Sequence, residues 1–135
     1  METRRNFVAK IAAGMAATGI TAVSGRVNAA EKPIKNVFIH HVFFWLKDTE
    51  NQEARKQFLD GLHKLITISL IKSSHIGLPV ESPRDVVDDS FTYSYMAFFD
   101  SKEDQTTYQT HPVHLKFVED CQHLWEKVVV YDAMD

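Results

Sequence analysis

A stretch near residue 110 combines side chains that could carry chemistry. Residues 108–114 read YQTHPVH, so a tyrosine and two histidines surround a proline. Proline favours the first turn of a helix, which places His114 near a helix N-terminus. The partial positive charge of that terminus disfavours a protonated ring. A neutral His114 could therefore act as a general base, with the Tyr108 hydroxyl as a hydrogen-bond donor beside it.

The same residues have a purely structural interpretation. Tyr108 and His114 could be core side chains whose polar atoms find partners within the fold. His111 and His114 lie three positions apart, but a zinc site would need further ligands. The sequence places no Cys, Asp or Glu clearly beside them. We therefore expect no bound metal and no cofactor.

The first element that must position these residues is a strand over residues 35–47. Its apolar residues alternate onto two faces. One face combines His40 with Val42, Phe44 and Leu46, and the other combines His41 with Ile39, Phe43 and Trp45. Helices in a small domain can cover only one of these faces, and His40 is expected on it, across from His114. A second subunit is expected to cover the other face.

The remaining patterns complete a βαββαβ order. A helix is expected after a cap at Asp48 or Thr49, then strands over 68–78 and 91–99 with a solvated loop over 79–90 between them. A short helix over 102–109 precedes one from Pro112 to about Trp125, and a strand over 127–132 closes the chain. The inner face of the last helix is expected to carry His114, Val118, Cys121 and Trp125. This order predicts a ferredoxin-like α+β fold, a four-stranded antiparallel sheet with helices on one face.

Composition limits the classes of function. The chain has 135 residues, one cysteine and a formal net charge of −3. One cysteine excludes an internal disulfide framework. A negative net charge gives the chain no overall electrostatic attraction for nucleic acid, so no nucleic-acid partner is expected.

Residues 1–29 have the features of an export signal. They carry four basic residues and one acidic residue, and a mildly apolar run over residues 11–23 follows the pair Arg4-Arg5. That run is too short to span a bilayer. The paired arginines before Phe7 resemble a twin-arginine signal, and Val27-Asn28-Ala29 suits cleavage before Ala30. We expect a bacterial periplasmic or otherwise exported protein, a mature domain over 30–135, and no stable membrane insertion once the signal is removed.

Four segments of the mature chain resemble the stress-responsive α/β-barrel (Dabb) family, within the dimeric α+β barrel superfamily. They are IHHVFFWLKD at 39–48, Ile76-Gly77, FFDSKEDQTTYQTHPVHLKFVED at 98–120, and VVVYD at 128–132. The resemblance implies ferredoxin-like monomers that pair into a dimeric α+β barrel. A homodimer joined through its sheet faces is therefore expected.

The resemblance also implies a site. Plant polyketide cyclases of the family are similar to this chain at Tyr108 and His114, where the histidine removes a proton next to a carbonyl and the tyrosine helps to hold the substrate. The family histidine of the first strand corresponds to His40, and the aspartate after the last strand, Asp132, is expected to orient a histidine. We expect His40, His111, Trp125 and Asp132 as the ligand-binding set.

Three functions are compatible with these observations. The first is a protein that binds a small hydrophobic ligand in a pocket of each subunit without catalysis. The second is an enzyme acting on a carbonyl compound, as in polyketide cyclases, with His114 as general base and Tyr108 as hydrogen-bond donor. The third is a monooxygenase without haem or flavin, because related dimeric α+β barrels oxidise aromatic substrates.

The signal interpretation predicts the outcome of one substitution. Replacing Arg4 and Arg5 with lysine should leave uncleaved precursor in the cytoplasm, because the twin-arginine route reads the paired arginines. Cell fractionation and N-terminal sequencing check this. Mature protein that still starts near Ala30 in the periplasm would contradict the twin-arginine route.

Overall fold

The structure, a computed structural model, describes residues 32–135. The expected signal and the cleavage site after Ala29 lie outside these residues. The elements in chain order are β1 (Phe38–Leu46), α2 (Gln52–Leu65), β2 (Ser73–Gly77), β3 (Tyr93–Phe99), α3 (Lys102–Gln109), α4 (Pro112–Cys121), the 3-10 turn η3 (Gln122–Leu124) and β4 (Trp125–Met134). None of the helices within the described range has the length and apolar character needed to cross a bilayer.

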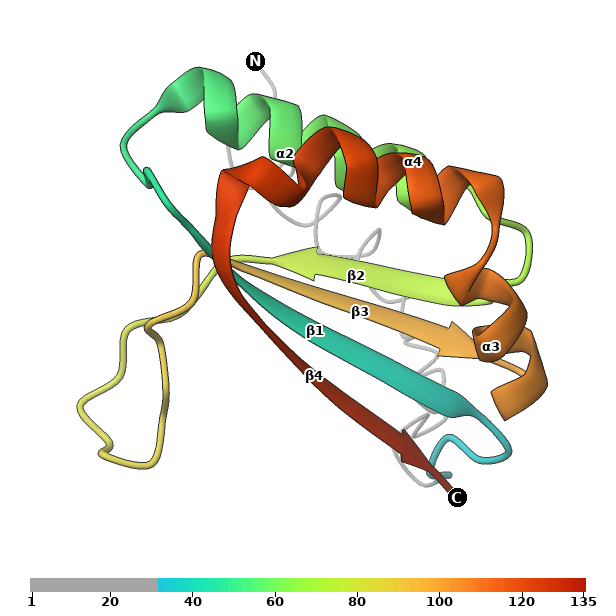
Figure 1. Cartoon of the computed structure of the whole chain (residues 1–135). Coiled ribbons are helices and arrows are strands. Elements are labelled where there is room, and N and C mark those ends of the chain that lie inside the picture. Colours follow the sequence, from blue (N-terminus) through green and yellow to red (C-terminus); the bar gives the residue numbers. More distant parts are fainter. Residues whose placement is uncertain (1–31) are drawn as a thin grey trace, which may run out of the picture. The chain divides into compact units, whose positions relative to one another are not determined.

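The four strands form one antiparallel sheet in the order β2-β3-β1-β4. Figure 1 shows α2 and α4 side by side over one face of this sheet, with α3 at one end of it. This arrangement is the ferredoxin-like α+β fold, so the predicted fold class is confirmed. Both long ladders run through β1, which pairs with β3 on one side and β4 on the other.

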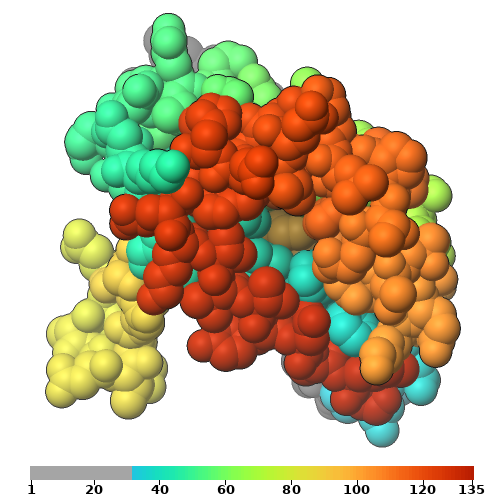
Figure 2. Space-filling model, in the orientation of Figure 1, coloured from blue at the N-terminus to red at the C-terminus, as the bar shows by residue number. Residues whose placement is uncertain are grey.

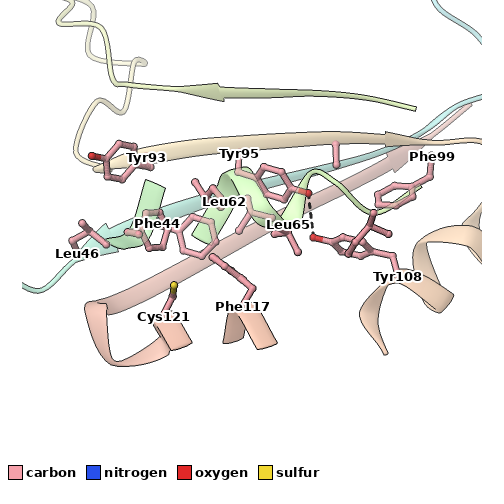
Figure 3. Packing of buried hydrophobic residues seen from close by; sticks show 14 of the residues in the cluster. Phe44, Leu46, Leu62, Leu65, Tyr93, Tyr95, Phe99, Tyr108, Phe117 and Cys121 are labelled. Carbon is pink, nitrogen blue, oxygen red and sulfur yellow. Dashed lines mark hydrogen bonds between the residues drawn. The ribbon is translucent and has the colours of Figure 1, made fainter. Parts of the chain in front are cut away.

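Alternation along β1 determines where the core lies. Every second residue from Phe38 to Leu46 is buried, and these residues face the helices. On β3 the alternate residues from Tyr93 to Phe99 are buried on the same face. Phe58 of α2 is fully buried between them, with its ring stacked 5.3 Å from that of Tyr93. Figure 3 shows Phe44, Tyr93, Tyr95 and Phe99 on the helix side of the sheet.

Several predicted boundaries were wrong. The N-cap of α2 is Asn51, whose Oδ1 accepts from the Ala54 amide at 3.1 Å, and is neither Asp48 nor Thr49. The second strand covers only 73–77 rather than 68–78. Residues 66–71 instead form tight turns, in which the Ile71 amide donates to the Ile68 carbonyl.

The end of the last helix also differs from the expectation. It stops at Cys121, and Trp125 is the first residue of β4 rather than part of the helix. Phe117 and Cys121 are the buried residues of α4, whereas His114 and Val118 are only partly buried. The inward face is therefore centred on Phe117, which the sequence pattern did not select.

Gly61 allows α2 and α4 to approach closely. A Cβ atom at position 61 would lie 2.6 Å from Cys121 Sγ and 3.1 Å from a Phe117 ring carbon. Both distances are shorter than normal van der Waals contact. Glycine in the middle of a helix otherwise costs free energy relative to alanine.

Replacement of Gly61 with alanine should lower the free energy of unfolding by about 1–3 kcal/mol, because overpacking outweighs the gain in helix propensity. The same substitution in a Cys121→Ala background should cost much less, since the nearest clashing atom is gone. Urea unfolding of the four proteins in this cycle measures the coupling. Equal costs in both backgrounds would contradict the contact.

Candidate active site

A cavity of about 140 Å³ lies between the sheet and α4, beside β4. Figure 2 shows the corresponding hollow in the surface between β4 and the helices α3 and α4, with β1 at its bottom. Most of its lining is aliphatic or aromatic, and the polar side chains come from four different elements. The lining residues are His40, Val42, Phe44, Leu65, Tyr95, Tyr108, Gln109, His114, Phe117, Val118, Trp125, Val128 and Val130. Val128 and Val130 are also exposed, so the cavity opens beside β4.

Two tyrosine hydroxyls meet in the cavity wall. Tyr95 of β3 and Tyr108 of α3 lie with their hydroxyl oxygens 3.1 Å apart, and both side chains are fully buried (Figure 3). Burial raises the pKa of Tyr95 to about 12, and burial together with the neighbouring Tyr95 raises that of Tyr108. Both therefore stay protonated at neutral pH. One of the two O–H groups donates within the pair, and the other remains able to donate to a ligand.

His114 lies in the first turn of α4, against Tyr108. Their ring centroids are 4.8 Å apart. Nδ1 of His114 is buried and has no hydrogen-bond partner in the described part of the chain. Burial is the main cause that lowers the pKa of His114. A hydrogen bond between the ring and the backbone of Gln109 acts in the opposite direction, and the charges of His40 and His111 lower the pKa further. The ring is neutral at pH 7, as a general base requires.

His40 faces the same cavity from β1 and is held by a carboxylate. Its Nδ1 lies 2.6 Å from Asp132 Oδ1. An ionised carboxylate only accepts, so Nδ1 carries the hydrogen, and the tautomer and orientation of the ring are fixed. The His40 ring is 5.9 Å from that of Tyr108. The register of β1 and β4 places His40 directly opposite Asp132.

The structure brings most of the predicted site residues together. His40, Tyr108, His114 and Trp125 line the cavity, and Asp132 contacts it through His40. His111 does not line it. Its Nδ1 accepts from the Val113 amide at 3.1 Å and caps α4, so it positions the helix that carries His114.

Sequence reasoning did not assign Tyr95, Gln109 and Phe117 to the site, nor the aliphatic side chains and Phe44 that complete its lining. Tyr95 could have been found from its position on the buried face of the third strand. Its pairing with Tyr108 depends on how α3 packs, which the pattern does not specify.

Two other features bear on what the site can hold. A larger groove, of about 1040 Å³, lies between the outer sides of α2 and α4, but none of the predicted site residues lines it. Among residues 32–135, no three His, Cys, Asp or Glu side chains are grouped so that they could hold a metal ion. The titratable side chains that line the smaller cavity are imidazoles and phenols.

Comparison with known proteins identifies the family of this ferredoxin-like domain. Residues 38–135 match the model of the stress responsive A/B barrel domain. The chain belongs to this family, as its sequence motifs suggested. No protein with a curated description matches the chain.

Solved structures with the same fold come from bacteria and plants. A Dabb family protein with a ferredoxin-like fold from Mesorhizobium loti is 26% identical, with a TM-score of 0.61 over 73% of this chain and 96% of that one. A hydroxynitrile lyase from Passiflora edulis is 24% identical, with a TM-score of 0.64 over 76% and 95%. A dimeric ferredoxin-like protein of unknown function from Thermobifida fusca is 18% identical, with a TM-score of 0.62 over 78% and 96%.

The environment of His114 predicts a pH dependence of stability. Its pKa in the folded protein lies below the ordinary value of 6.5, so the unfolded chain binds the proton more tightly. The contribution of the neutral ring is therefore complete above pH 6.5, and it is lost as the pH falls from 6.5 through the lower pKa of the folded protein. In His114→Phe, which also removes the unpaired buried nitrogen, the free energy of unfolding should fall less between pH 7 and pH 5.

Urea unfolding at several pH values measures this difference. The matched control is His123→Phe in η3, whose side chain is exposed. If wild type and His114→Phe lost stability in parallel on acidification, the ring would not be a buried neutral base.

Proposed function

We propose that the exported mature domain binds a small, mostly apolar carbonyl compound in this cavity, and that His114 removes a proton from the carbon next to the carbonyl. The observation that carries the proposal is the position of the His114 ring, which lines the cavity with its centroid 4.8 Å from that of Tyr108. Burial lowers the pKa of this ring, so it is neutral at pH 7 and can accept a proton.

The polar groups of the cavity suit a carbonyl compound. The spare O–H of the Tyr95–Tyr108 pair can donate to a carbonyl oxygen, and it stabilises that oxygen most when negative charge develops on it. Neutral His114, whose ring lies against Tyr108, is the group that can take the proton. The Asp132–His40 pair adds a second imidazole at the base of the same cavity.

The size of the cavity limits the ligand. About 140 Å³ is well below the ~300–1,000 Å³ of sites for drug-sized ligands. Aromatic rings dominate its inner walls, with Phe117 stacked on Trp125 at 5.8 Å. A planar compound with a single ring matches this space.

The catalytic part can be tested without knowing the natural substrate. With 1-phenylpropan-2-one as the probe in D₂O, proton NMR should show enzyme-dependent exchange of the hydrogens next to the carbonyl. His114→Ala should slow the exchange by ~10²–10⁴-fold, and Tyr108→Phe by ~10²–10³-fold. His123→Ala, with an exposed ring, should leave the exchange unchanged.

Native mass spectrometry of protein isolated from its own host tests ligand binding separately. A retained small molecule that is lost in His114→Ala, with no proton exchange in wild type, would support binding without catalysis. Exchange that is unaffected by His114→Ala would overturn the assignment of the base.

We further propose that the mature chain is a homodimer joined through the sheet faces that carry no helix. The helices α2, α3 and α4 lie on the side of His40, and the outer face carries Ile39, Phe43 and Trp45 of β1. On β4, Tyr131 is 65% exposed, and its ring lies 6.1 Å from that of Phe43. A second copy would remove this apolar face from water.

Light scattering at neutral pH should give twice the mass of the mature chain. Phe43→Asp should shift the protein to monomer, because it places a charge in the interface. Leu115→Asp, at an exposed apolar position of α4, should remain dimeric. A monomeric wild type at micromolar concentration would contradict the dimer.

A further inference from the structure

The outer face of the sheet carries two histidines among its apolar residues. His41 of β1 and His75 of β2 both lie opposite Met96 of β3 in the register, one on each side of it. Nε2 of His41 is 2.7 Å from Ser94 Oγ, and its ring lies 4.2 Å from that of Phe43. The His75 ring lies over Gly77, where a Cβ atom would be 2.8 Å from its Cε1.

No carboxylate shares this face of the strands in the described chain. Strand alternation gives β3 the outward residues Ser94, Met96 and Phe98, and gives β4 the outward residues Lys127, Val129, Tyr131 and Ala133. Tyr131 lies directly opposite His41. Lys127, the one cation among these residues, lies 4.4 Å above the Trp45 ring.

The carboxylates around the face have other partners. Asp88 of the 78–92 loop bonds to Ser90 and lies near Lys127, and Asp100 pairs with Lys72. Asp135 accepts from the backbone amides of Asn36 and Val37. No carboxylate is among the groups that shift the pKa of His41.

From this arrangement we propose that the sheet-face dimer is a pH-sensitive assembly, in which protonation of His41 at mildly acidic pH drives the two copies apart. The proposal rests on the dimer proposed above. Each copy contributes one His41, so association at low pH would bury two positive charges in an apolar interface without counter-charges. Burial of unpaired charge is strongly unfavourable.

In the single subunit, the pKa of His41 is already shifted in the direction that the proposal requires. Burial lowers the pKa of His41, and the nearby His75 and His40 lower it further. A second copy would remove more water from the ring, which acts in the same direction. Dimer formation therefore releases protons, and acid opposes it.

The experiment compares the dimer dissociation constant of the full mature chain at pH 7.5 and pH 5.0 by analytical ultracentrifugation, with circular dichroism to confirm that the subunits stay folded. Each histidine whose pKa falls by one unit on association weakens the dimer up to about tenfold in acid, so the constant should rise by at least tenfold. In His41→Gln it should change by less than about threefold. Glutamine at position 41 can still bond to Ser94.

The controls separate this proposal from the others. His63→Gln/His123→Gln replaces two exposed histidines of α2 and η3 and should behave like wild type. A protein that is monomeric at both pH values overturns the dimer itself. A dimer equally tight at both pH values, or one whose acid dissociation is unchanged in His41→Gln, overturns the pH dependence and leaves the dimer standing.

Discussion

The side chains of β1 alternate between the two faces of the sheet, and the core, the cavity and the outer face all follow from this alternation. As an inner strand β1 pairs on both edges, and its side chains divide strictly between two faces. On one face Val42, Phe44 and Leu46 form the floor of the core, and the helices must cover them. A slip of one residue would expose this set and move His40 away from the cavity. The register that buries the core therefore also aligns His40 with Asp132.

The cavity lies at the edge of the region of the sheet that the helices cover. The helices protect β1 and β3, but β4 is an edge strand whose Val128 and Val130 stay partly in water. The cavity occupies this incompletely filled region, and its polar groups come from two strands, the end of α3 and the start of α4. Rigid elements hold each of them: β3 holds Tyr95, β1 holds His40, and the cap formed by His111 fixes the first turn that carries His114. Such preorganisation is what a site for a small molecule needs.

Much of this arrangement could be predicted from the sequence, and the exceptions have physical causes. The run at 38–46 has the period and residue types of a buried strand, and Pro112 marks a helix start. The cap of α2 was ambiguous, because Asp48, Thr49 and Asn51 are all good N-cap residues. The sequence pattern placed the inward face of α4 wrongly. Packing decides that Phe117 faces the core and that β4 starts at Trp125, and the local pattern does not show either. The Tyr95–Tyr108 contact joins residues of separate elements, and no local pattern encodes it.

The adjacency of His40 and His41 has a consequence for communication across the sheet. Their rings lie on opposite faces, yet charge on His40 lowers the pKa of His41. Thermodynamic linkage is reciprocal. A ligand that changes the charge on His40 therefore changes the proton affinity of His41, and protonation of His41 changes the affinity for that ligand. One peptide unit of β1 couples the interior of the domain to its far surface electrostatically, and this coupling requires no movement of the backbone.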